Sequence, residues 1–218
     1  MLIREEAHKA LCSGIAALPF EVTAAQIAKL EQYLALLNQW NRVHNLTAVR
    51  DEVEQVKVHI LDCLAIVPYL PEGRLADIGS GAGLPALILA IMQPERAIVA
   101  VESSSKKAAF IRQVQSALGL KKVEVVSKRV EAWQDKVDVV VSRAMAEVNL
   151  LLDLTKHLAH ERTEWWLMKA LQEETIRREG FVQHQIEVHV PLLEGKRVLL
   201  QVRQQSNGTS RSQSALET

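Results

Sequence analysis

The sequence is poor in cysteine and contains no long apolar run. Cysteine occurs only at positions 12 and 63, far apart and without the spacing of a metal site, so we expect neither a disulfide framework nor an oxidising compartment. No apolar run approaches the roughly 20 residues that a membrane-spanning helix needs. Near the start, Arg4 is followed at once by two glutamates, which is not the pattern of a signal peptide. These absences predict a cytoplasmic protein without a membrane segment.

The sequence also lacks net charge. It has 26 basic and 26 acidic residues, so no long-range field attracts the whole molecule to nucleic acid, and any site for a polyanion must be a local patch. No group of His, Cys and carboxylate residues has metal-ligand spacing, so no metal is expected. With 218 residues, of which 48% are hydrophobic, the chain can form one α/β core with an appendage. A monomer is the default expectation.

The first part of the chain has the pattern of helices. Thr23 and Gln26 form a capping-box signal before apolar residues at helical spacing. Asp51 and Glu54 repeat this signal before a second apolar stretch, which Pro68 closes. We expect a helical extension over residues 1–70.

From Arg74 onward, short apolar runs alternate with helix-length segments, which is typical of βαβ units on a parallel sheet. The candidate strands are residues 75–78, 97–102, 123–126, 137–142, 164–169, 185–190 and 197–202, and the candidate helices are residues 85–92, 104–118 and 148–158. Only residues 191–196 join the last two strands, so these should pair as an antiparallel hairpin at the end of the sheet. We therefore predict a Rossmann-like α/β domain over residues 71–203 and a polar tail over residues 204–218.

A glycine loop follows the first candidate strand. Gly79, Gly81 and Gly83 alternate with small residues, so the backbone can turn tightly and lie close to a ligand. The dinucleotide fingerprint needs a glycine where Leu84 stands, and no Lys followed by Ser or Thr completes a P-loop. The loop indicates a nucleotide-like cofactor that has no pyrophosphate.

Two acidic residues beside this loop favour a cationic ligand. Asp77 ends the strand before the loop, where it would repel pyrophosphate and attract an amine or a sulfonium. Glu102 ends the next strand, where a carboxylate can accept hydrogen bonds from both ribose hydroxyls. S-adenosylmethionine has both cations and the ribose, so it is the predicted cofactor. The alternative is a tight strand-to-helix turn with two incidental acids.

Segments on both sides of the loop resemble one family, the bacterial small-subunit ribosomal RNA guanine-N7 methyltransferases, also called glucose-inhibited division protein B. The matching segments are Trp40-Asn41 with Asn45-Leu46-Thr47, His59-Ile60-Leu61-Asp62, Asp77-Ile78-Gly79-Ser80-Gly81-Ala82-Gly83-Leu84-Pro85, Arg129-Val130-Glu131 and Ser142-Arg143-Ala144. They extend in order over most of residues 30–170. Their combination is far more specific than the glycine loop alone.

The resemblance implies a seven-stranded class I methyltransferase sheet with an N-terminal helical extension, in agreement with the segments above. It also implies cofactor contacts from Gly79, Gly81 and Leu84, with Asp77 beside them, an adenine side formed by Val130 and Glu131, and a ribose contact from Glu102. Arg143 would reach the cofactor or the incoming base. The chain departs from the family at Ala86 and Ala170, where glycine is usual, and at Glu102, where aspartate is commoner.

The chemistry implied by the family needs little from side chains. Guanine N7 has a free lone pair at neutral pH, so its methylation requires no general base, and the enzyme mainly aligns an in-line displacement. N7 must face the methyl group, which excludes a grip on both N7 and O6, so we expect Arg143 to hold guanine O6 or a phosphate. Asn45 and His59 join Arg143 as candidate catalytic residues by resemblance. For Asn45 a turn or cap role is an equal alternative, and for His59 with Asp62 a contact that joins the helices to the sheet is the alternative.

Local basic residues are candidates for binding 16S ribosomal RNA or the small ribosomal subunit. Lys106, Arg129 and Lys169 lie on segments near the carboxyl ends of strands, which border the expected site. Lys121 and Lys122 are interpreted instead as a solvated surface. Two other functions stay open: a methyltransferase of the same fold that acts on a small molecule or a protein, and a catalytically silent RNA-binding module.

Overall fold

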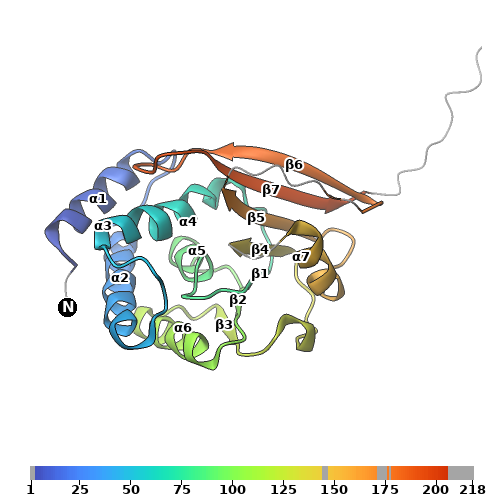
Figure 1. The fold of residues 1–218 in the computed structure, drawn as a ribbon, viewed down its shortest axis with the longest axis horizontal. Helices are drawn as coiled ribbons and strands as arrows, with labels where there is room; N and C mark the ends of the chain where they lie inside the picture. The colour runs from blue at the N-terminus through green and yellow to red at the C-terminus, as the bar shows by residue number, and fades with distance from the viewer. Residues whose placement is uncertain (1–2, 144–146, 171–175, 177, 206–218) are drawn as a thin grey trace, which may run out of the picture.

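The computed structural model describes residues 3–143, 147–170, 176 and 178–205. Its centre is a seven-stranded sheet with the strand order β3-β2-β1-β4-β5-β7-β6. The strands are β1 Leu75–Ile78, β2 Ile98–Val101, β3 Val123–Val126, β4 Val139–Arg143, β5 Glu164–Ala170, β6 Phe181–Val188 and β7 Arg197–Gln204. The first five strands are parallel to one another, and β7 pairs antiparallel with both β5 and β6. The predicted hairpin is therefore confirmed, and it forms one side of the molecule in Figure 1.

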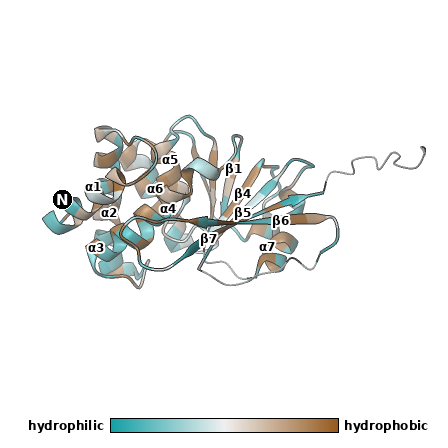
Figure 2. Cartoon of the chain, turned by 90° about the horizontal axis from the view of Figure 1, so that it is seen from above, coloured by the Kyte–Doolittle hydropathy of each residue, from teal (hydrophilic) through white to brown (hydrophobic). Residues whose placement is uncertain are grey.

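Side chains alternate between two apolar clusters, one on each face of the sheet. Leu75 and Ile98 belong to the cluster that includes Phe110 of helix α6 (Ser105–Leu118) and the buried face of α5 (Ala86–Met92). Their neighbours along the same strands belong to the other cluster, which α7 (Val148–Thr155) covers. Figure 2 shows apolar colouring along the central strands and hydrophilic colouring on outer elements such as α3. This alternation places Asp77 on the same face as α5 and α6.

The first seventy residues are largely helical, as predicted. The elements are α1 Glu5–Ala16, α2 Ala24–His44, α3 Glu52–Gln55, η1 Val56–Leu61, α4 Asp62–Ala65 and η2 Val67–Tyr69. Both capping signals form, because Thr23 Oγ1 accepts from Gln26 N at 3.2 Å and Asp51 Oδ1 accepts from Glu54 N at 3.0 Å. Apolar residues of these helices share one core cluster with the sheet. None of the helices in the described part of the chain is long and apolar enough to cross a membrane.

Most elements lie within about three residues of the predicted bounds, and two differ in more important ways. The sixth strand begins at Phe181 and ends at Val188, whereas the apolar pattern placed it at residues 185–190. It is an edge strand with a single neighbour, so its first half tolerates polar residues that hide the strand signal. The helix after Asp51 is not a continuous α-helix, because η1 is a π-helix. Single π-turns leave no clear sequence signature and occur often at functional sites.

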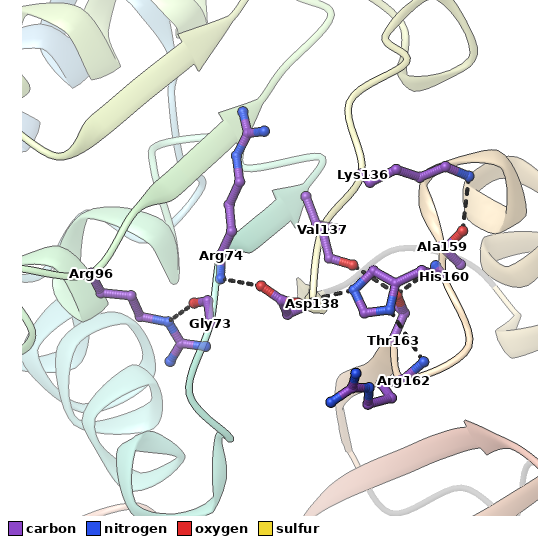
Figure 3. A network of polar contacts seen from close by, with 10 residues as sticks. All are labelled: Gly73, Arg74, Arg96, Lys136, Val137, Asp138, Ala159, His160, Arg162 and Thr163. Carbon is purple, nitrogen blue, oxygen red and sulfur yellow. Dashed lines mark hydrogen bonds and ion pairs between the residues drawn. The ribbon is translucent and has the colours of Figure 1, made fainter.

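A polar network stabilises the edge of the sheet where the parallel strands begin, on the side away from the glycine loop (Figure 3). Asp138 Oδ2 accepts from Arg74 N at 2.7 Å, and Asp138 Oδ1 lies 2.9 Å from His160 Nε2. Arg96 donates to the Gly73 carbonyl oxygen at 2.9 Å. The backbone N–H of Arg74 lowers the pKa of Asp138, and His160 acts in the same direction. These contacts fix the amino ends of the strands. The glycine loop lies at the opposite edge of the sheet, after the carboxyl end of β1. The predicted polar tail lies outside the described residues beyond Gln205.

Candidate functional site

The glycine loop follows β1 at the carboxyl edge of the sheet. Gly79, Gly81 and Gly83 have φ angles of +73°, +56° and +77°, which only glycine adopts without strain. The Gly79 and Ser80 amides donate to the Val101 carbonyl oxygen at 2.9 and 3.2 Å. Tyr33, a fully buried residue of α2, donates its hydroxyl to the Ala82 carbonyl oxygen at 3.0 Å. The helical extension therefore helps to shape the loop.

Space around the loop differs between two of its glycines. A Cβ atom on Gly83 would lie 2.3 Å from Leu87 Cδ1, so this glycine allows α5 to pack against the loop. A Cβ atom on Gly81 would meet nothing closer than the Gly79 carbonyl oxygen at 3.9 Å. The loop is thus closely packed on its helix side and open at Gly81.

Asp77 is fully buried at the start of this loop. Its Oδ2 atom accepts from Ala86 N at 3.1 Å, whereas Oδ1 has no hydrogen-bond partner. Burial raises the pKa of Asp77 to about 7, although the Ala86 amide, the Ser80 side chain and Arg143 act in the opposite direction. A buried carboxylate oxygen without a partner is costly, so a cationic ligand group at Oδ1 would be strongly stabilising.

Glu102 follows β2 and faces the open part of the loop. Its Oε2 atom accepts from Gly81 N at 2.8 Å, and its Oε1 atom accepts from Ser104 N at 2.7 Å. Each oxygen keeps a second lone pair, which two neighbouring hydroxyls of a ribose can use. Asp77 and Glu102 together fit S-adenosylmethionine, because one can bind the amino group and the other the ribose. Leu84 is buried and precedes a cis peptide bond with Pro85.

A cavity of about 430 Å³ lies between the π-helix η1, the end of β5 and the β6–β7 hairpin. Its polar lining consists of His59, Asp62, Arg143, Lys169 and Arg197. Arg143 connects the cavity with the start of the glycine loop, because it ends β4, the strand beside β1, and the preceding Ser142 donates to the Ile78 carbonyl oxygen at 3.0 Å. A cavity of this size, with a mostly apolar wall and a few polar groups, is suited to bind a small molecule or a nucleobase.

The cavity wall is rich in cationic donors around one carboxylate. Arg143 Nη1 lies 3.7 Å from Asp62 Oδ2, and Arg197 Nε lies 3.4 Å from Asp62 Oδ1. Burial raises the pKa of Asp62, and the two guanidinium groups oppose that shift. Arg143 also donates to the Val58 carbonyl oxygen at 2.8 Å. Asp62 and the π-helix thus orient two arginines whose remaining N–H groups suit phosphate or carbonyl oxygens.

His59 is buried and lies between a hydroxyl and a guanidinium. Its Nε2 atom lies 2.9 Å from Thr47 Oγ1, and its Nδ1 atom lies 3.4 Å from Arg143 Nη1. Burial, together with Arg143, lowers the pKa of His59 to about 4, so the ring is neutral at physiological pH. His59 and Asp62 do not pair with each other. Both contact Arg143 and so join the N-terminal helices to the sheet, as the structural alternative predicted.

The structure does not bring every predicted residue to the cavity. Asn45 ends α2 in a left-handed conformation, and its Oδ1 atom accepts from Arg50 Nη2 at 2.6 Å, which is the turn role. Val130 is buried among apolar residues of the α7 face, and Glu131 is exposed. Lys106, on the first turn of α6, and Arg129, after β3, are also exposed. A contact of Asn45, Glu131, Lys106 or Arg129 with a ligand stays a prediction.

The sequence did not indicate that Arg197 belongs to the site, and it indicated Asp62 only as a neighbour of His59. Arg197 starts β7 and reaches the site only because that strand pairs with β5 beside the cavity. A basic residue at the start of a hairpin strand gives no local signal of this kind. Asp62 has one clue, its position three residues after His59, but the π-helix decides where both side chains lie.

Comparison with known proteins agrees with this geometry. The family model of rRNA small subunit methyltransferase G, named GidB, matches residues 26–200. The ribosomal RNA small subunit methyltransferase G of Dichelobacter nodosus is 45% identical over 92% of this chain and 97% of its own length. That of Hydrogenovibrio crunogenus is 45% identical over 80% of this chain and 84% of its own length.

Among solved structures, a mutant of MtNAS in complex with S-adenosylmethionine has a TM-score of 0.53 at 15% identity, over 84% of this chain and 72% of its own. That likeness concerns the fold, which is the class I methyltransferase fold predicted from the sequence. The sequence matches extend from α2 through the glycine loop to β7, and so include every residue of the cavity wall named above. The chain belongs to the rRNA small subunit methyltransferase G family, GidB.

Proposed function

We propose that this protein transfers a methyl group from S-adenosylmethionine to N7 of a guanine in small-subunit ribosomal RNA. The observation that carries the proposal is the partnerless Oδ1 atom of Asp77 at a glycine loop beside the end of β4, where Arg143 lines a cavity with cationic side chains. The relatives' names supply the RNA, since each is called a ribosomal RNA small subunit methyltransferase. A ribosomal substrate would place the protein in the cytoplasm, and we propose that it acts there as a monomer.

The cofactor side of the site follows from charge and space. We assign Asp77 to the amino group, Glu102 to the ribose hydroxyls, and Gly79, Gly81 and Leu84 to the loop that borders the cofactor. Val130 and Glu131 are proposed along the adenine. When bound, S-adenosylmethionine supplies an electrophilic methyl group, and the chain's residues supply position. Holding donor and acceptor in line accounts for a large part of the rate in such reactions.

The substrate side requires donors more than a base. N7 of guanine needs no deprotonation, which agrees with a neutral, hydrogen-bonded His59 that is not available to remove a proton. Arg143, Lys169 and Arg197 line the cavity and can donate to phosphate or to oxygen atoms of the base. We propose Lys106 and Arg129 as outer contacts to the RNA backbone.

The test is tritiated methyl transfer from S-adenosylmethionine to small ribosomal subunits, and to their naked RNA, prepared from cells that lack the modification. The expected product after nucleoside digestion is N7-methylguanosine in small-subunit RNA. An Arg143→Ala variant should lose activity at limiting RNA and cofactor, while Lys121→Gln serves as a charge-matched control on the surface. If the tritium were found in protein or in small molecules instead, the methyl acceptor would not be RNA. RNA binding without transfer would identify a silent module.

A further inference from the structure

Asp62 provides the one carboxylate in the wall that the described residues form around the 430 Å³ cavity. Its side chain is 11% exposed, and Arg143, Lys169 and Arg197 supply the cationic groups of the same wall. Apart from His59, the other lining residues are valine, isoleucine, leucine and methionine. A flat apolar ring with polar atoms along one edge, such as a nucleobase, suits a wall of this composition.

The two arginines hold the Asp62 carboxylate without saturating it. Arg143 Nη1 lies 3.7 Å from Oδ2 and Arg197 Nε lies 3.4 Å from Oδ1, whereas a charge-assisted hydrogen bond between such groups is about 2.7 to 2.9 Å long. A carboxylate has about four lone-pair sites, so each oxygen retains acceptor capacity. Burying a charge without close partners is costly, so a ligand that brought two parallel N–H groups to Asp62 would be bound strongly.

Guanine has such a pair of donors on its Watson–Crick edge. Its N1–H and N2–H groups point in the same direction, and the acceptor O6 stands beside N1. A carboxylate flanked by guanidinium groups is complementary to this edge, because it offers two acceptors for the N–H groups and a neighbouring donor for O6. Adenine and cytosine present an unprotonated ring nitrogen to the carboxylate, and uracil lacks the second donor.

We propose that Asp62 determines base specificity, by accepting hydrogen bonds from N1–H and N2–H of the target guanine. The proposal rests on the proposed function. N7 lies on a different edge of the base, so Asp62 can hold the Watson–Crick edge while N7 faces the methyl group. Arg143 and Arg197 attract any phosphate or carbonyl oxygen and so contribute affinity, whereas a buried carboxylate rejects a base that leaves its oxygens without donors.

This contact also constrains the RNA. The Watson–Crick edge is free only in a nucleotide that is not base-paired, so the target guanine must be single-stranded or turned out of a helix when it is methylated. The cavity lies between η1 and the β6–β7 hairpin, and Asp62 directly follows η1. A single base that enters between these elements brings its edge to the carboxylate.

The experiment compares small-subunit RNA, naked or in subunits, that has guanine or hypoxanthine at the methylated position. Hypoxanthine retains N7, O6 and N1–H and lacks only the N2 amino group. Wild type should have an about 10- to 100-fold lower kcat/KM with hypoxanthine, because one hydrogen bond to a charged acceptor is lost. The amide of Asp62→Asn offers one acceptor in place of two. This variant should lose about 10- to 100-fold with guanine and much less with hypoxanthine, so the preference for guanine disappears.

Arg197→Gln is the matched control, because it breaks the same ion pair from the other side and leaves the carboxylate in place. It should lower kcat/KM with both bases and retain the preference for guanine. If Asp62→Asn instead lost activity equally with both bases, Asp62 would act only by orienting the arginines, and the inference would be overturned.

Melting temperature and affinity for S-adenosylmethionine show whether each variant is folded. If Asp62→Asn is not, Asp62→Glu takes its place, because it keeps the charge beside both arginines and displaces the carboxylate by one methylene. The same loss of preference is expected, and a retained preference overturns the inference. A wild type that methylates guanine and hypoxanthine equally well also overturns it and leaves the proposed function intact. A wild type that transfers no methyl group to guanine-containing RNA refutes the proposed function itself.

Discussion

The Oδ1 atom of Asp77 gives the site a pH dependence. Because the pKa of this carboxyl is about 7 in the ligand-free protein, it is partly protonated at neutral pH. An ammonium group beside it favours the ionised form, so cofactor binding should release a proton. We expect the affinity for S-adenosylmethionine to fall about tenfold for each pH unit below 7, and to fall again above about pH 8 as the α-amino group of the cofactor loses its proton. Isothermal titration in buffers of different ionisation enthalpy measures both effects.

Asp77→Asn is the matched control for this prediction, because the amide has nearly the same shape and does not titrate. Its affinity should be lower at pH 7.5 than that of wild type and nearly constant between about pH 6 and 7.5. If the variant kept the wild-type slope, another group would be responsible, and the assignment of Asp77 to the amino group of the cofactor would be wrong.

Gly81 and Gly83 should respond differently to alanine, although both have positive φ angles. In Gly83→Ala the new methyl group would overlap Leu87, a fully buried residue of α5, so we expect the free energy of unfolding to fall by about 2 to 4 kcal/mol. In Gly81→Ala the strain costs about 1 to 2 kcal/mol, and the methyl group enters the open space beside Glu102. This second variant should fold but bind S-adenosylmethionine at least about tenfold more weakly.

Thermal unfolding and cofactor titration of the two variants separate these effects. We expect Gly83→Ala to have the lower melting temperature. We expect Gly81→Ala to lose more cofactor affinity than its small loss of stability explains. If affinity fell in proportion to stability in both variants, the cofactor would not occupy the open side of the loop.

At the scale of elements, α2 connects the helical extension to the cofactor loop through Tyr33. Removing its hydroxyl in Tyr33→Phe leaves the buried Ala82 carbonyl without a donor, so we expect a loss of about 1 to 3 kcal/mol in stability. Because that carbonyl belongs to the glycine loop, affinity for S-adenosylmethionine should also fall. Thr23→Ala on the same helix is a suitable control, since it removes a cap for about 1 kcal/mol and is distant from the loop. A cofactor affinity that changed equally in both variants would contradict a specific role for Tyr33.

The sequence predicted those elements whose signal is local. β1 and β3 have the predicted bounds, both capping signals form, and the glycine loop lies where the strand pattern placed it. The start of β6 was not predictable, because the first half of this edge strand contains polar residues that interrupt the apolar pattern. The π-helix was not predictable either, because a short π-helical stretch leaves no clear residue pattern and follows the same apolar spacing as the helix around it.

The same division applies to the candidate site. Asp77 lies near the end of β1, Gly79 and Gly81 follow it, and Glu102 follows the neighbouring parallel strand β2. Their meeting at one edge of the sheet could therefore be inferred from chain order alone. The approach of Arg197 to Asp62 could not, because it depends on β7 entering the sheet between β5 and β6. The sequence left Asn45 with either a turn role or a substrate-side role. The structure shows the turn role, because the Asn45 side chain accepts from Arg50.

At the scale of the whole molecule, zero net charge makes binding of RNA depend on where the cations lie. Arg143, Lys169 and Arg197 gather in one cavity at the carboxyl edge of the sheet, with Lys106 and Arg129 on segments that follow β2 and β3 at the same edge. Lys121 and Lys122 directly precede β3 and so lie at the opposite, amino edge. The two pairs of exposed cations have equal charge and different positions relative to the site, which makes them a controlled comparison.

Removal of Lys106 and Arg129 as a double glutamine variant should weaken RNA binding and reduce its salt dependence. Each phosphate contact that is lost lowers the slope of log affinity against log salt by about 0.7 to 0.9. Lys121→Gln with Lys122→Gln removes the same charge at the amino edge and should leave the slope within error of wild type. Filter binding of small-subunit RNA from about 50 to 200 mM salt measures both slopes. Equal slopes for the two double variants would show that total charge, rather than the position of the cations at the carboxyl edge, governs RNA binding.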